Sequence, residues 1–87
     1  MSGKNVVFEK AAVAVKSLPQ RPDNETLLQL YALYKQGSVG NVAGDKPGFF
    51  DFVGVAKYEA WKKLQGTSME DAQFRYVELV RKLVGEV

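Results

Sequence analysis

The sequence predicts an all-α domain of four helices, with one long loop between the second helix and the third. Apolar residues recur at spacings of three and four in four separate stretches, which is the pattern of a helix with one buried face. Prolines, glycines and side chains suited to helix capping stand between these stretches. Eighty-seven residues, 46% of them hydrophobic and 25% charged, are typical of one ordered domain spanning residues 1–87.

The first predicted helix runs from about Asn5 to Leu18, where apolar side chains recur at helical spacing. Pro19 and Pro22 then bracket a linker, because proline cannot continue a helix. The apolar stripe of this helix consists of Phe8, Ala11, Ala12, Val15 and Leu18.

The second predicted helix runs from about Asn24 to Gln36, and Asp23 is its N-cap candidate. Gly37 is the expected C-terminal stop. The apolar face of this helix consists of Leu27, Leu30, Tyr31 and Tyr34, with Leu28 beside them.

Residues 37–50 hold four of the eight glycines of the chain together with Pro47, and we interpret them as a long ordered loop. The third helix is predicted from about Asp51, its expected cap, to Leu64. Gly54 lies inside this helix at a cost of about 1 kcal/mol relative to alanine, so we interpret it as a point of close approach by another helix or a ligand.

The fourth helix is predicted from about Ser68 to Val84. Two capping registers are open at its start. Thr67 with Glu70 matches the capping-box spacing, and so does Ser68 with Asp71. Its apolar positions include Ala72, Tyr76, Val77, Val80, Leu83 and Val84.

The composition excludes several classes of function. The chain has no cysteine and no histidine, which excludes disulfides, zinc sites built on Cys or His, and a Ser-His-Asp triad. A net charge of +2 does not indicate general affinity for nucleic acid. No apolar run approaches the roughly 20 residues of a membrane span, and the N-terminus fits neither a signal peptide nor a myristoylation motif. We therefore expect a cytoplasmic protein with no integral membrane association.

Two tyrosines and a lysine end the second predicted helix. Tyr31 lies three residues before Tyr34 and four before Lys35, so the three side chains are neighbours on one helix surface. Such a group suits a phosphorylated purine, because rings can stack on the base while phenols and an ammonium bind phosphate. The alternative is that the tyrosines are half-buried core residues and Lys35 a solvated helix end.

Further candidates are open to the same two interpretations. Lys57, Lys16 and Arg21 are either surface cations or members of a phosphate site that the fold would assemble from different helices. Trp61 and Tyr76 suit a packed core, with the Tyr76 hydroxyl reaching the surface. The glycines of the long loop do not follow a strand, so they are weak evidence for dinucleotide binding.

Taken together, these elements resemble the acyl-CoA-binding protein family over nearly the whole chain. The resemblance lies in the order and spacing of short motifs, none of which is diagnostic alone. The matching residues are Phe8, Tyr31–Gln36, Val39-Gly40, Pro47-Gly48, Asp51–Trp61, Gly66–Ser68 and Tyr76.

The resemblance implies an up-down-down-up four-helix bundle and a fatty acyl-CoA ligand rather than a cofactor. It implies that Tyr31 and Lys35 contact the nucleotide of CoA and that Lys57 binds the 3′-phosphate, with Tyr34 beside the adenine and Tyr76 in the same site. It further implies that Lys16 adds charge at the rim and that Ala11 lies near the nucleotide. Leu27 and Leu28 would line the acyl path.

The chain departs from the family pattern at a few positions. Val53 and Val55 stand where the family often has lysine, Tyr58 replaces a common tryptophan, and Asn41 replaces an acid. The loss of two lysines is expected to change the charge of a rim that faces a membrane or a partner. It is also expected to affect which acyl-chain lengths are preferred. None of these changes touches the implied nucleotide site.

The leading hypothesis is a carrier that binds medium- to long-chain acyl-CoA one-to-one in the cytoplasm, as a monomer and a complete small protein. Under this hypothesis the carrier makes transient contact with membranes or with acyl-CoA-using enzymes. The second hypothesis is a helical protein-interaction module without a small ligand. An acyl-CoA-using enzyme is the third, although the sequence offers no base, nucleophile or metal site for it.

Overall fold

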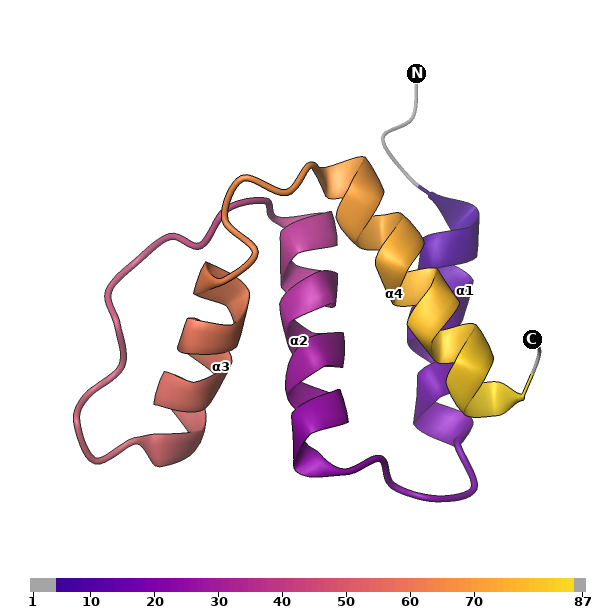
Figure 1. The fold of residues 1–87 in the computed structure, drawn as a ribbon, viewed down its shortest axis with the longest axis horizontal. Helices are drawn as coiled ribbons and strands as arrows, with labels where there is room; N and C mark the ends of the chain where they lie inside the picture. The colour runs from indigo at the N-terminus through magenta and orange to yellow at the C-terminus, as the bar shows by residue number, and fades with distance from the viewer. Residues whose placement is uncertain (1–4, 86–87) are drawn as a thin grey trace.

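A computed structural model describes residues 5–85 of the chain and confirms the all-α prediction. In order, the elements are α1 (Val6–Ala14), a short 3₁₀ turn η1 (Val15–Ser17), α2 (Asn24–Ser38), α3 (Phe52–Lys62) and α4 (Met69–Val84). Figure 1 shows α2 and α3 running in one direction while α1 and α4 run in the other, which is the up-down-down-up order. No helix among the described residues is long and apolar enough to cross a bilayer.

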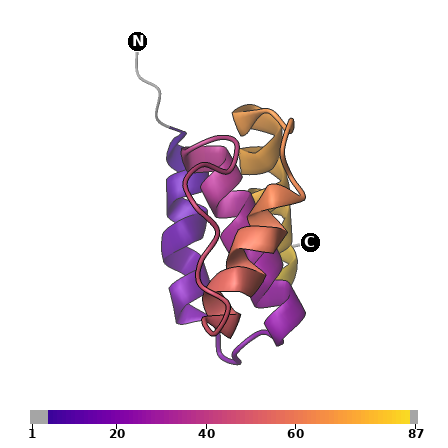
Figure 2. The same cartoon turned by 90° about the vertical axis from the view of Figure 1, so that its left-hand side faces the viewer.

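The helices form a flat body whose extents are 38 × 36 × 16 Å. Helix α2 lies at the centre, packed against α4 on one side and α3 on the other, while α1 packs against α4. Figure 2 shows the long loop from α2 crossing the outer side of α3 before it turns into that helix. Helix α3 and the loop therefore form one side of the molecule, and α1 with α4 forms the other.

Side-chain caps fix where each helix begins. Asp23 Oδ1 accepts a hydrogen bond from the Thr26 amide at 2.8 Å, and Asp51 Oδ1 accepts one from the Gly54 amide at 2.9 Å. Both caps were predicted, and each satisfies an amide that has no partner inside the helix. At α4 the second of the two open registers holds, since Ser68 Oγ accepts from the Asp71 amide at 3.0 Å.

The hydrophobic core lies where α1, α2 and α4 meet. All of its members except Leu33 come from the apolar stripes that the sequence predicted for these three helices. They are Phe8, Ala11, Leu30, Leu33, Ala72, Tyr76, Val77 and Val80. Because α3 contributes only the buried Trp61, the body of the domain is chiefly a three-helix structure.

The prediction that Gly37 ends α2 is wrong, because the helix continues through Ser38. Gly37 is buried in the helix, and a Cβ added there would lie 3.0 Å from Gln73 Cγ and 3.1 Å from Phe8 Cζ. The stop is provided by Gly40 instead, whose φ of 98° is the left-handed conformation that closes helices. Helical spacing cannot distinguish a glycine that ends a helix from one that admits a neighbour.

Replacing Gly37 with alanine is expected to destabilise the domain by about 1–2 kcal/mol. Alanine normally stabilises a helix interior relative to glycine by about 1 kcal/mol, but here the added methyl group overpacks the contact with Phe8 and Gln73. Chemical denaturation would measure the difference in unfolding free energy. Gly48→Ala is the matched control, since a Cβ at Gly48 meets nothing within 4 Å. Equal stability of the two variants would contradict this account.

The interpretation of Gly54 as a contact with another helix or a ligand is also wrong. The space that a Cβ would occupy at this position is filled by the carboxylate of Asp51, the cap of the same helix. Gly54 is therefore required by the local geometry of the cap, and it carries no information about a distant partner.

The loop between α2 and α3 is ordered, as predicted, and specific bonds hold it. Asn41 Oδ1 accepts from Gln36 Nε2 at 2.9 Å and from the Gly66 amide at 2.8 Å. The indole N–H of Trp61 donates to the Gly40 carbonyl at 2.8 Å, and Lys46 pairs with Glu59 at 2.6 Å. The loop is thereby fastened both to the top of α2 and along α3.

Candidate functional site

Three aromatic rings from three helices meet on one side of the core. Phe8 of α1, Tyr34 of α2 and Tyr76 of α4 are in mutual contact. Its ring stacks on that of Tyr34 with centroids 5.4 Å apart and meets Tyr76 edge-on at 5.3 Å, while the two tyrosine rings are 5.8 Å apart. Tyr76 is buried, whereas Tyr34 is 41% exposed, so the cluster leads from the core to the surface.

Burial raises the pKa of the Tyr76 phenol above its usual value, and the neighbouring Tyr34 adds to the effect. Removing the phenolate from water is costly, so the protonated form is favoured. At physiological pH the Tyr76 hydroxyl is neutral, as in any tyrosine, and it can donate a hydrogen bond to an anion or accept one from a cation.

The raised pKa of Tyr76 predicts a specific loss of stability at alkaline pH. Between the unfolded pKa, about 10, and the higher folded value, the unfolded chain releases a proton that the native state keeps. The stabilisation is therefore complete below about pH 10 and declines as pH rises through the folded pKa. Denaturation midpoints measured from pH 8 to 11.5 should fall less steeply for Tyr76→Phe than for the wild type. Tyr58→Phe serves as the control, and an identical decline for Tyr76→Phe and wild type would contradict the prediction.

A cavity of about 550 Å³ opens between α1 and α2 beside these rings. Its walls combine aromatic and apolar side chains with a cation at one edge and an acid at another. It is lined by Glu9, Ala12, Val13, Val15, Lys16, Leu30, Tyr31, Tyr34 and Tyr76. Four residues chosen from the sequence, Lys16, Tyr31, Tyr34 and Tyr76, thus share one hollow.

Two further lysines stand over aromatic rings on the α3 side of α2. Lys57 Nζ lies 5.2 Å from the ring centroid of Tyr31, and Lys35 Nζ lies 5.1 Å from that of Trp61. Both distances are within the range of cation–π attraction. Because Tyr31 lines the cavity, Lys57 places a second positive charge next to it, in addition to that of Lys16. Lys35 lies above the buried indole of Trp61.

The charges of these lysines are available to an anionic ligand. Within residues 5–85, the ion pairs join Lys46 to Glu59, Arg75 to Asp71 and Arg81 to Glu78, and none involves Lys16, Lys35 or Lys57. Phosphate groups are the ligands best suited to several lysines and tyrosine hydroxyls around aromatic faces. No group of three or more potential metal-ligating acids occurs in that same range.

The remaining predicted positions lie outside this cavity. Ala11 belongs to the buried core on the α1 side, and Leu27 is partly buried against that core. Leu28 lines a second cavity, also of about 550 Å³, formed by α2, α3 and α4. Arg21 lies in the linker, where its guanidinium donates to Asn24 Oδ1 at 3.4 Å.

The structure adds residues to the cavity that the sequence did not single out as site residues. Glu9 and Val13 lie in its α1 wall, and Val13 is 66% exposed. Neither falls on the predicted apolar stripe of α1, so helical spacing assigns both to the solvent side. The exposed side of α1 forms part of the hollow only because α2 lies beside it, which spacing within one helix cannot show.

Comparison with known proteins gives a consistent result. The family model for the Acyl CoA binding protein matches residues 5–80. An acyl-CoA-binding protein homolog of Drosophila melanogaster is 51% identical over 79 residues, and homolog 1 of Caenorhabditis elegans is 49% identical over 79 residues. Each of these two alignments covers 91% of this chain and 92% of the relative.

Solved structures agree with the sequence relatives. The crystal structure of acyl-CoA-binding protein 2 from Oryza sativa superposes with a TM-score of 0.88 at 41% identity, over 93% of this chain and 90% of that one. The solution structure of acyl coenzyme A binding protein from yeast gives a TM-score of 0.75 at 46% identity, with coverages of 92% and 93%.

Proposed function

The chain belongs to the acyl-CoA-binding protein family, and on that premise we propose that it binds medium- to long-chain fatty acyl-CoA thioesters one-to-one and carries them. The observation that carries the proposal is the hollow beside α2, where Lys16, Tyr31, Tyr34 and Tyr76 line one cavity and Lys57 stands over the Tyr31 ring. Its mixture of cations, phenols and aromatic faces matches a phosphorylated adenine nucleotide.

The nucleotide end of the ligand is assigned to this hollow. Tyr31 and Tyr34 offer ring faces and hydroxyls to the adenine and its ribose, and Lys57 offers an unpaired charge for the 3′-phosphate. Lys35 and Lys16 supply further charge for the diphosphate from the α3 and α1 sides. Tyr76 contributes its neutral hydroxyl from the core, where Ala11 of α1 also lies, and the small Ala11 side chain leaves room near the nucleotide.

The acyl end is assigned to the apolar side chains in the first half of α2, Leu27 and Leu28. Each methylene that leaves water contributes roughly 0.8 kcal/mol, so even a shallow path selects chains of sufficient length. Leu28 is partly buried and lines the cavity between α2, α3 and α4, which makes it the better placed of the two to meet a chain.

A carrier of this kind needs no catalytic group, and the chain is a binding protein rather than an enzyme, as its family is. The ligand is cargo and not a cofactor. We further propose that the protein acts as a cytoplasmic monomer that meets membranes or acyl-CoA-using enzymes only transiently. One polar hollow and one apolar path on a single chain are sufficient for that role.

Isothermal titration calorimetry with palmitoyl-CoA below its micelle-forming concentration tests the proposal, with free CoA and palmitate as separate titrants. We expect one site per chain for the thioester and much weaker binding of either half, because the affinity depends on both ends being held at once. A folded sample that does not bind palmitoyl-CoA would overturn the proposal.

A further inference from the structure

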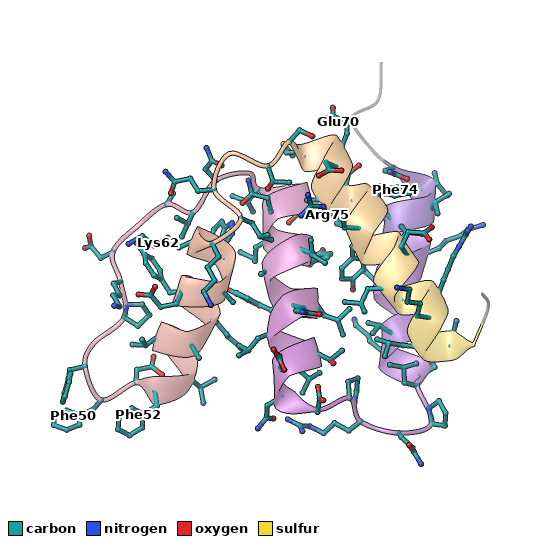
Figure 3. The ribbon with its side chains drawn as sticks, in the orientation of Figure 1. Phe50, Phe52, Lys62, Glu70, Phe74 and Arg75 are labelled. Carbon is teal, nitrogen blue, oxygen red and sulfur yellow. The ribbon has the colours of Figure 1, made fainter. Side chains whose placement is uncertain are left out.

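Four large apolar side chains project into solvent where the long loop enters α3. Phe49 and Phe50 are each 82% exposed, Phe52 is 72% exposed and Val53 is 67% exposed. We call these four residues the aromatic tip. Figure 3 shows Phe50 and Phe52 pointing away from the body at the outer corner of the molecule.

The side chains of the aromatic tip do not belong to the hydrophobic core. The rings of Phe49 and Phe50 meet edge-on with centroids 5.1 Å apart, but both remain open to solvent. The neighbouring loop is nevertheless held in place, since Lys46 pairs with Glu59 and the Tyr58 hydroxyl donates to the Gly44 carbonyl at 3.4 Å. A fastened loop that presents unburied phenylalanines contributes nothing to the core, and a contiguous exposed apolar patch is typical of an interaction site.

We propose that the aromatic tip docks on the surface of a lipid bilayer. Aromatic rings favour the boundary between headgroups and acyl chains, and a few of them suffice for shallow, reversible insertion. A protein partner is the poorer fit, because a specific protein interface buries about 800 Å² on each side and involves about 20–30 residues. Four contiguous side chains at one corner cannot supply that area.

The charges around the tip indicate how it would bind. Asp45 and Lys46 precede it in the loop, and Asp51 lies within it at the helix cap. Lys57 follows on α3, so acids and cations are balanced close to the tip. Binding should therefore depend on apolar insertion rather than on attraction to anionic lipid, and it should change little with salt.

The position of the tip indicates what docking on a membrane would do for an acyl-CoA carrier, and this step rests on the proposed function. Helices α2 and α3 run in parallel, so the start of α3 and the start of α2 lie at the same end of the molecule (Figure 1). The tip is thus at the end that holds Leu27 and Leu28, to which the acyl chain is assigned. Docking would bring this end of the carrier to the surface where acyl-CoA itself partitions.

Flotation with phosphatidylcholine vesicles tests the inference. We expect the wild-type protein to float in part, and the double variant Phe49→Ala/Phe50→Ala to partition roughly tenfold less for each ring removed. Phe49→Trp/Phe50→Trp should partition at least as well as the wild type, because indole favours the interface. Val6→Ala/Val7→Ala is the control at an exposed apolar pair on α1 and should behave as the wild type.

The opposite results are equally clear. No flotation of the wild type, or equal flotation of wild type and the double alanine variant, would overturn the inference, and so would loss of flotation on tryptophan substitution. Titration with octanoyl-CoA in the absence of vesicles separates this inference from the proposed function. The double alanine variant should bind it as the wild type does, and a loss of that binding would assign the tip to the ligand site instead. A wild type that floats but binds no acyl-CoA would overturn the proposed function alone.

Discussion

Reversing one charge, Lys57→Glu, is expected to weaken acyl-CoA binding by about 30- to 1,000-fold while leaving the domain folded. A hydrogen bond between charged groups contributes about 1.5–3 kcal/mol, and a carboxylate beside a phosphate adds repulsion to that loss. The lysine is exposed and makes no ion pair within the described chain, so the fold does not depend on its charge. Calorimetric titration with palmitoyl-CoA gives the affinity, and circular dichroism gives the state of the fold.

The matched control for this prediction is Lys62→Glu. Lys62 also lies on α3 and is also exposed, so its reversal changes the net charge by the same amount without touching the hollow. Weakening by both variants to a similar degree would show that overall charge, and not the position of Lys57, governs affinity. If neither variant affects a wild type that does bind, the 3′-phosphate lies elsewhere.

Removing the α1 ring of the aromatic cluster, Phe8→Ala, is expected to cost about 3–5 kcal/mol of unfolding free energy. Phe8 is 5% exposed and contacts the rings of both Tyr34 and Tyr76, so the truncation leaves a void that three helices share. Small domains have about 5–15 kcal/mol in total, so the variant would approach the limit of folding at 37 °C. Urea denaturation monitored by far-UV circular dichroism measures the change.

Phe52→Ala is the same chemical change at a residue that is 72% exposed, and it should alter stability by no more than about 0.5 kcal/mol. Phe8→Leu, which retains most of the volume, should fall between the two. A cost below about 1 kcal/mol for Phe8→Ala would mean that Tyr34 and Tyr76 close over the void. In that case the geometry of the hollow does not depend on the α1 ring.

The sequence predicted the helices well because their ends are coded locally. Asp23, Asp51 and Ser68 each bond to an amide three residues ahead, an interaction that the neighbouring residues alone determine. The prediction for Gly37 failed for the opposite reason, whereas Gly54 is required by the local geometry of its own helix cap. Gly37 is small because of Phe8 and Gln73, which come from other helices and are remote in sequence, and a single helix pattern cannot contain that information.

In the candidate site, too, local relations could be predicted from the sequence, and relations between helices could not. Tyr31, Tyr34 and Lys35 were found together because neighbouring positions on one helix are necessarily close. That Tyr34 lies 5.8 Å from Tyr76, or that Lys57 stands over Tyr31, follows only from how α2 packs against α4 and α3. The resemblance to a family supplied these long-range relations in advance, but the separate cavity that Leu28 lines was not anticipated.

The attachment of α3 has a consequence for how the domain opens. Its principal helix contact is with α2, and the rest of its attachment consists of a few bonds at its two ends and along the loop. Such a unit can detach locally at a fraction of the global unfolding free energy while α1, α2 and α4 stay folded. Amide hydrogens of α3 should thus exchange by a subglobal event, and those of the three-helix body by complete unfolding. A ligand that contacts both Tyr31 of α2 and Lys57 of α3 would connect α3 to the three-helix body. Ligand binding would therefore make the two parts unfold together, as one cooperative unit.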